Sequence, residues 1–82
     1  MPRVLPKYTV TIEHPKSTNA LGWADTQIRR AIRQARAALR KWPARSKLTV
    51  RGWQPGDTSK RGRVEYQAHL GADGKIIVVE ER

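Results

Sequence analysis

Four arginines recur at helical spacing in the middle of the chain. The four, separated in turn by four, three and four residues, are Arg29, Arg33, Arg36 and Arg40. On a helix they fall within an arc of roughly 60° and form a charged row about 16 Å long, which we call the arginine stripe. A row of guanidinium groups can bind successive phosphates of a nucleic acid, because each group offers several donors and a fixed positive charge.

The arginine stripe has almost no acidic partner nearby in the sequence. A helix stabilised by its own charges interleaves Glu with Lys or Arg, whereas the nearest acid here is Asp25, at the predicted first turn. Arg30 and Lys41 flank the stripe on its far side and add to its charge. Six cations on one helix can also be a solvated face. The missing acids favour phosphate binding over that interpretation.

The composition indicates one small, strongly basic domain. The 82 residues include 17 Lys and Arg against 7 Asp and Glu, a formal net charge of +10. The part that ends at Trp42 holds nine basic and two acidic residues, and the part that begins at Pro43 holds eight and five. The excess is therefore concentrated in the half with the helix, as expected of a binding surface. Nucleic acid, an acidic protein or an anionic membrane would complement such a charge.

The sequence argues against several other classes of protein. It has no cysteine, and His14 and His69 have no metal-ligand spacing with carboxylates, so we expect no metal and no cofactor. No apolar run approaches the roughly 18 residues of a membrane span, and no signal-peptide pattern opens the chain. The apolar face of the predicted helix is rich in Ala and belongs to a core, so we expect no membrane binding and a cytoplasmic location.

Alternating apolar and polar residues predict four strands. They span residues 7–14, 47–53, 63–70 and 75–81. In the third of these, Val64 is expected to face inward, and Glu65 and His69 outward. The last strand is apolar on both faces in its middle, which predicts a central or covered position. Gly71 to Gly74 reads as the hairpin turn that precedes it.

One amphipathic helix is predicted between the first two strands. It is expected to begin between Ala20 and Asp25 and to end near Trp42, because Pro43 removes a donor and restricts the residue before it. Its core-facing side chains are expected to be Ile28, Ile32, Ala35, Leu39 and Trp42. The predicted fold is a single-domain α+β structure of order β-α-β-β-β, with the helix on a four-stranded, mostly antiparallel sheet and an irregular arm at residues 1–6.

A second basic group surrounds the polar loop at residues 54–62. Its members are Arg51, Lys60, Arg61 and Arg63. Trp53 opens this loop, and a Trp beside cations can stack on a base. The alternative is that Trp53 only covers the edge of the sheet. Whether the second group shares a face with the arginine stripe is open at this stage.

The sequence favours a non-enzymatic protein. Metal-free cleavage of RNA needs an acid, a base and a cation near the scissile phosphate. Glu65 and His69 are predicted on one strand face but about 13 Å apart, which is too far for direct cooperation. No nucleophile elbow, phosphate-cradling Gly loop or paired-carboxylate motif is present.

Two families share features with the chain. Residues 8–12 (YTVTI), 38–42 (ALRKW), 48–50 (LTV) and the hairpin around 72–74 (ADG) are similar in order to the ribosome hibernation-promoting factors. That resemblance implies binding in the decoding channel of the small ribosomal subunit. The hairpin formed by residues 63–67 and 75–79 also resembles the end of RelE-like toxins, which cleave messenger RNA on the ribosome.

These observations lead to three hypotheses. The first is a nucleic-acid-binding protein without enzymatic activity that contacts structured or ribosomal RNA, rather than DNA, through the arginine stripe. The second is a small inhibitor of the phage type that binds an acidic or RNA-containing protein complex. The third is a RelE-like ribonuclease toxin. The sequence does not settle the oligomeric state.

Overall fold

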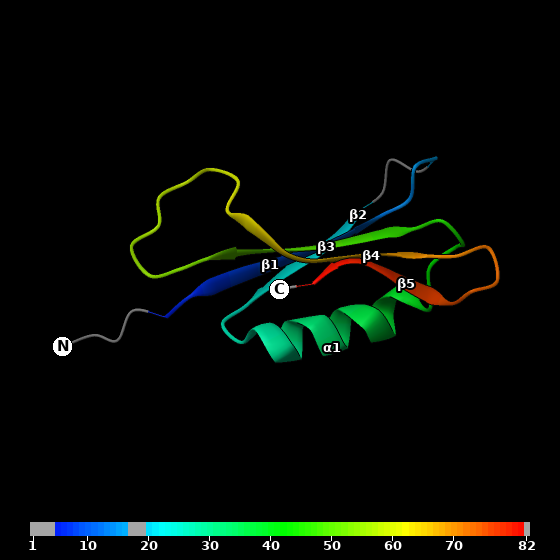
Figure 1. The fold of residues 1–82 in the computed structure, drawn as a ribbon, viewed down its shortest axis with the longest axis horizontal. Helices are drawn as coiled ribbons and strands as arrows, with labels where there is room; N and C mark the ends of the chain where they lie inside the picture. The colour runs from blue at the N-terminus through cyan, green and yellow to red at the C-terminus, as the bar shows by residue number, and fades with distance from the viewer. Residues whose placement is uncertain (1–4, 17–19, 82) are drawn as a thin grey trace.

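The computed structural model describes residues 5–16 and 20–81 as one helix packed on a five-stranded antiparallel sheet (Figure 1). In chain order the elements are β1 (Lys7–Glu13), β2 (Ala20–Asp25), α1 (Ile28–Leu39), β3 (Lys47–Trp53), β4 (Arg63–Leu70) and β5 (Ile76–Glu81). The strands lie side by side in the order β2-β1-β3-β4-β5. The α+β class is confirmed, but the sheet has a fifth strand. Of the predicted irregular arm, Leu5 and Pro6 have no regular structure and residues 1–4 lie outside the described part.

The additional strand is β2, where the sequence predicted the start of the helix. Ala20–Asp25 pairs antiparallel with β1, so that Trp23 lies opposite Val10. The prediction was wrong because Leu21 and Trp23 alternate with small residues, a weak strand signal that pairing with β1 makes stable. The helix begins only at Ile28, after the strand has ended.

The helix packs against the sheet through an Ala-rich face. Ala31, Ala35 and Leu39 have no exposed surface, and Ile28 and Ile32 pack at the margin of the core. The predicted apolar arc is confirmed, with Ala31 as a further buried residue that the prediction did not include. The helix ends at Leu39, three residues before the predicted end, but a bond from the Trp42 N–H to the Leu39 carbonyl continues the turn. Trp42 packs on the core as expected.

The face of the sheet below α1 supplies the rest of the core. Its buried side chains are Tyr8, Val10, Ile12, Leu48, Val50, Tyr66, Ala68 and Leu70. These side chains come from β1, β3 and β4. The helix α1 packs over these three strands and also over β2. Each buried side chain alternates with polar residues on the open face, the period-two pattern that the sequence predicted.

A β-bulge in β4 changes which side chains face α1. The pairing shifts between Tyr66, opposite Val50, and Val64, opposite Arg51, so Glu65 is the extra residue. A Cβ at Gly52 would lie 3.0 Å from Cγ of Glu65 and 2.9 Å from ring carbons of Tyr8. Glu65 therefore lies on the α1 side. The predictions that Val64 faces inward and Glu65 outward were wrong, because alternation cannot indicate a bulge.

The last strand lies at the edge of the sheet and not in its middle. Among the described strands, β5 pairs with β4 alone, and Ile77, Val78 and Val79 are 47%, 41% and 59% exposed. The prediction of a central or covered position was wrong, because α1 packs over the other strands and the hairpin leaves the outer edge of β5 without a neighbour.

Candidate functional site

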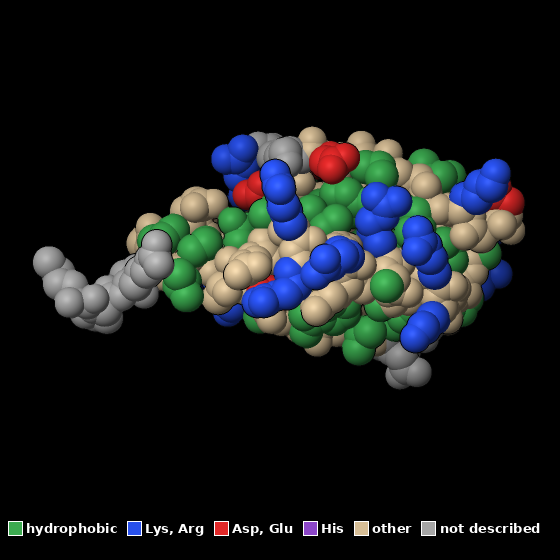
Figure 2. Space-filling model, turned by 90° about the horizontal axis from the view of Figure 1, so that it is seen from below, with side chains coloured by type: hydrophobic (Ala, Val, Ile, Leu, Met, Phe, Trp, Pro, Cys, Tyr) green, Lys and Arg blue, Asp and Glu red, His purple; other side chains and the backbone are tan. Residues whose placement is uncertain are grey.

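The arginine stripe lines an open groove between α1 and β5. The groove has a volume of about 400 Å³, and the residues around it are Arg29, Ile32, Arg33, Arg36, Arg40 and Glu81. Viewed from the side of α1, Lys and Arg side chains gather over this face of the molecule (Figure 2). All four arginines of the stripe are thus brought to one concave surface, as their spacing predicted.

The position of the stripe follows from how α1 is seated. Ala31, Ala35 and Leu39 point into the core. The arginines of the stripe lie about 100° farther around the helix axis, so their side chains point along the sheet toward β5. Ile32 lies between the two arcs, half-buried, and contributes an apolar wall to the groove. Arg36 is half-buried, whereas the other three arginines of the stripe are exposed. The helix therefore spaces the four arginines regularly along the groove.

The acid nearest in sequence does not neutralise the stripe. Arg30 donates from Nε to Oδ2 of Asp25 at 2.8 Å and from Nη2 to Oδ1 at 2.6 Å. Within residues 5–16 and 20–81, no hydrogen bond or ion pair engages the guanidinium groups of the four stripe arginines. The four guanidinium groups in the groove are thus without a direct partner among the described residues.

Asp25 also fixes the start of the helix. Its Oδ1 accepts hydrogen bonds from the N–H groups of Thr26 at 2.7 Å and Gln27 at 3.0 Å. The hydrogen bond from Arg30, together with these backbone donors, holds the pKa of Asp25 well below its usual range, and Asp25 in turn raises the pKa of Arg30. Of the predicted site residues, Arg30 is therefore engaged in holding the helix start.

One carboxylate at the groove, Glu81, is not indicated by any pattern in the sequence. Glu81 ends β5 opposite Tyr66, on the side of the sheet that α1 covers, and lines the groove with the stripe. No spacing rule links Glu81 to the helix, since only the order of the strands brings them together. Glu81 would repel an anion at its own end of the groove, and the rest of the groove stays positive.

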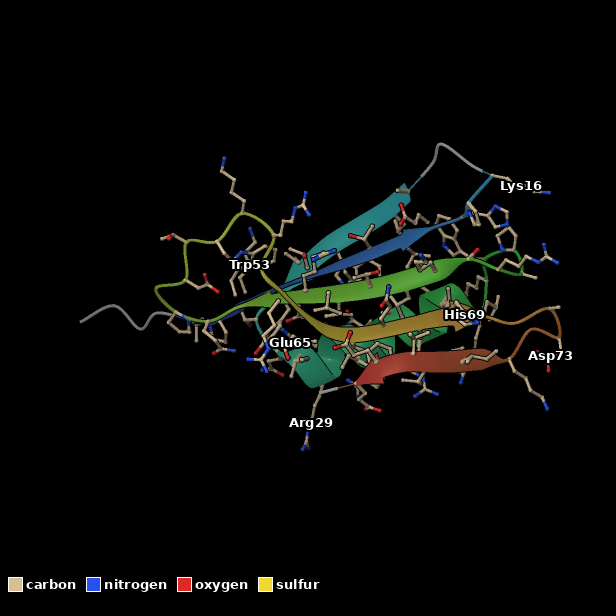
Figure 3. All side chains as sticks on the ribbon, turned by 45° about the horizontal axis from the view of Figure 1, so that its top comes forward. Lys16, Arg29, Trp53, Glu65, His69 and Asp73 are labelled. Atoms are coloured by element: carbon tan, nitrogen blue, oxygen red, sulfur yellow. The ribbon has the colours of Figure 1, made fainter. Side chains whose placement is uncertain are left out.

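The second basic group does not form one surface with the stripe. Arg51 faces the open side of the sheet, and its Nη1 donates to the carbonyl of Arg61 at 3.5 Å. Lys60 and Arg61 belong to the loop beyond the end of β3, whereas Arg63 pairs with Gly52 and so faces the α1 side. Lys41 is exposed in the turn after α1. In Figure 3 the base of this loop, at Trp53, is well separated from Arg29.

Trp53 contacts its own loop. Its Nε1 donates to the Ser59 carbonyl at 2.7 Å, and Nζ of Lys7 lies 5.8 Å from the ring centroid. Gly62, at φ +66°, is so close that a Cβ there would lie 2.6 Å from Cε2 of the indole. Trp53 therefore packs on its own loop at the end of β3. Because β3 is the central strand of the sheet, the alternative that Trp53 covers a sheet edge was wrong.

The two residues considered for acid–base chemistry lie on opposite faces of the sheet. The bulge places Glu65 beside Gly52 on the α1 side, whereas His69 pairs with Lys47 and Ile77 and faces the open side. Figure 3 shows them far apart along β4. The prediction that they share a face was wrong. Among the described residues there is also no group of three His, Asp or Glu side chains placed to hold a metal ion.

No described helix is both long enough and apolar enough to cross a membrane. Comparisons with models of protein families, with curated proteins and with solved structures found no match. Function is therefore inferred from the geometry of the groove.

Proposed function

We propose that this protein binds nucleic acid through the arginine stripe, without enzymatic activity, and that its ligand is structured RNA. The observation that carries the proposal is the groove itself, in which Arg29, Arg33, Arg36 and Arg40 gather around a single carboxylate, Glu81, and form no hydrogen bond or ion pair with the described residues. Bringing four cations together costs free energy unless an external anion completes the site, and a phosphate backbone supplies anions at regular intervals.

The length and rigidity of the stripe favour a backbone over a single anion. The four residues rise about 16 Å along α1, a distance that spans several consecutive phosphates. The open shape of the groove gives access to a chain that passes through it. RNA is favoured because structured RNA is recognised largely by shape and by backbone contacts, for which the groove has the needed donors.

The other two hypotheses have less support. A ribonuclease of the RelE type would need an acid and a base that act together, and Glu65 and His69 face opposite sides of the sheet. An inhibitor that binds an acidic or RNA-containing protein complex would use the same charged groove. It is therefore kept as an alternative outcome of the experiment below.

The test compares two variants with equal net charge. In the first, Arg29, Arg33, Arg36 and Arg40 are changed to Gln, and in the control, Lys16, Lys41, Lys60 and Arg61 are changed to Gln. Binding of each to an RNA hairpin is measured over a series of salt concentrations. The first variant is expected to lose affinity by orders of magnitude and to show a salt slope lower by about 3, since each phosphate contact contributes about 0.7–0.9.

The control variant is expected to keep most of the affinity, because its lost cations lie outside the groove. Equal losses in both variants would show that net charge, and not the groove, binds RNA. A pull-down from lysate with and without nuclease tests the alternative. A specific protein partner that survives nuclease and is lost only with the stripe variant would favour the inhibitor.

A further inference from the structure

The edge strand β5 has the composition of a covered strand. Ile77, Val78 and Val79 are consecutive, branched and 41–59% exposed, and no strand of the described chain pairs with their outer edge. An edge of this kind normally carries a charge or a proline to block pairing with another chain. Here neither occurs between Ile76 and Val79. The free backbone groups and the apolar side chains together indicate a missing neighbour.

The opposite edge of the sheet differs. β2 lies partly under α1, and its half-buried Trp23 packs on the core. Leu21, which is 42% exposed, is the one large apolar side chain of β2 that is strongly exposed. The apolar exposure is thus concentrated on β5.

We propose that β5 pairs antiparallel with β5 of a second copy of this chain, to form a homodimer with one continuous sheet. The ends of the strand support this occupant. Lys75 precedes the apolar residues and Glu81 follows them. A ladder centred on Val78 places the basic end of one copy against the acidic end of the other and places the apolar residues together between them.

Two features make this dimer weak and dependent on salt. Val79 is an extra residue in the pairing with β4, since Gln67 pairs with Glu80 and Ala68 pairs with Val78. That bulge shortens the regular part of the edge. Each copy also carries a net charge of +10, so that the two copies repel each other. Salt screens this repulsion, and dimerisation is therefore expected to strengthen as salt is added.

The symmetry of the dimer has a consequence for the groove. Antiparallel edge strands are related by a twofold axis perpendicular to the sheet, so both helices lie on the same face. Each arginine stripe points toward β5, and the two grooves therefore open toward each other across the dimer axis. With strands about 4.8 Å apart, the helix axes are about 30 Å apart, with the two β5 strands between them. That the joined groove binds RNA rests on the proposed function, but the dimer itself does not.

Sedimentation equilibrium of the full chain, over low-micromolar to submillimolar concentrations at low and high salt, tests the dimer without RNA. The wild type is expected to pass from monomer to dimer, with tighter association at high salt. Changing Ile77 and Val79 to Lys should weaken association at least tenfold. The matched control, Leu21→Lys with Ala24→Lys, adds the same two cations to the other edge strand and should leave association unchanged. Circular dichroism checks that each variant is folded.

Disulfide trapping tests the register. The chain has no cysteine, so Val78→Cys introduces a single thiol. Opposed residues of an antiparallel pair have Cα atoms about 4.5–5.5 Å apart, within the about 4.4–6.8 Å that a disulfide spans. Under mild oxidation this variant should form a covalent dimer much faster than the control Leu21→Cys. Equal rates, or a wild type that stays monomeric at every concentration and salt, would overturn the proposal.

The two proposals can fail separately. If the protein dimerises through β5 but does not bind RNA, the dimer is supported and the proposed function is wrong. If the protein is a monomer that binds RNA through the stripe, the proposed function is supported and the dimer is wrong. The β5 edge would then be expected to pair with a different protein.

Discussion

Arg30 holds Asp25 through two parallel hydrogen bonds, and this pair joins the end of β2 to the first turn of α1. The side-chain exposure of Asp25 is 7%, whereas that of Arg30 is 43%. The pair thus links the end of β2 to the start of α1. Because Asp25 is bound to Arg30, it does not neutralise the arginines of the stripe. One arginine of the helix is structural, and the four on the adjacent arc remain available to a ligand.

We predict that Asp25 contributes stability that disappears in acid. Its pKa in the folded protein lies below the ordinary value of 3.8, so the contribution is present above about pH 4 and is lost as pH falls through the lowered pKa. Asp25→Asn should lower the Tm at neutral pH, and the difference in Tm between variant and wild type should shrink as the pH falls from about 4 toward 2. The measurement is thermal unfolding between pH 2 and 7. Glu13→Gln, at an exposed position, is the control, and an Asp25→Asn curve parallel to that of the wild type would contradict the prediction.

Gly62 and Gly56 provide a matched test of the contact with Trp53. Both have positive φ, +66° and +86°, but a Cβ at Gly56 meets nothing within 4 Å, whereas one at Gly62 meets the indole. Gly56→Ala should cost about 1 kcal/mol of backbone strain, and Gly62→Ala should cost more, by about 1–3 kcal/mol. Denaturant unfolding measures both costs. Trypsin cleavage at Lys60 and Arg61 should speed up for Gly62→Ala alone, and equal effects would show that Trp53 does not shape the loop.

Tyr66 carries a buried hydroxyl group without a hydrogen-bond partner in the described structure. The residue has no exposed surface, and its ring belongs to the core. Tyr66→Phe removes the unsatisfied group and keeps the ring, so the free energy of unfolding should stay unchanged or rise by about 1 kcal/mol. Denaturant unfolding is the measurement. A loss of more than about 1 kcal/mol would mean that the hydroxyl has a partner in solution.

We predict weak discrimination between nucleic-acid sequences. The stripe has no Asn or Gln on its arc, since Gln34 lies on another side of α1, and contacts to phosphates position a ligand without reading bases. Unrelated RNA hairpins of equal length should compete within about tenfold of one another. A single sequence that wins about a thousandfold, the ratio that separates specific from non-specific binding, would contradict this.

Expression of the protein tests the ribonuclease hypothesis. Because Glu65 and His69 face opposite sides of the sheet, high-level expression should not arrest growth, and His69→Ala should behave like the wild type. The measurement is the growth rate of the host after induction. Severe arrest that His69→Ala relieves would require a catalytic site that includes this residue.

The sequence predicted the elements that have strong periodicity. The alternation of Tyr8, Val10 and Ile12 and the four-three-four spacing of the arginines are local patterns, and the structure confirms the strand, the helix and the shared side of the four arginines. The class of fold follows from these elements, because one amphipathic helix has to cover one apolar sheet face at this chain length.

The remaining features depend on contacts that local patterns do not contain. Ala20–Asp25 becomes a strand only because β1 offers an edge to pair with. The bulge at Glu65 reverses side-chain facing through a shift in register with β3, and Glu81 reaches the groove because β5 follows β4 in the sheet. Each depends on which strands are neighbours, which residue spacing along one segment cannot indicate.

The pairing of β1 with β3 also determines when the stripe exists. β1 and β2 pair locally, and β3 to β5 form a local meander. Among the described strands, the β1–β3 ladder alone joins segments that α1 separates. A helix of 12 residues is only marginally stable in water on its own. The arginines therefore line up only when β1 has paired with β3 and α1 has packed on the sheet. An RNA that binds the aligned arginines therefore binds the native state and not the unfolded chain. At a hundred times its Kd, such a ligand would add about 2.7 kcal/mol to the free energy of unfolding, and folding and binding become a single linked equilibrium.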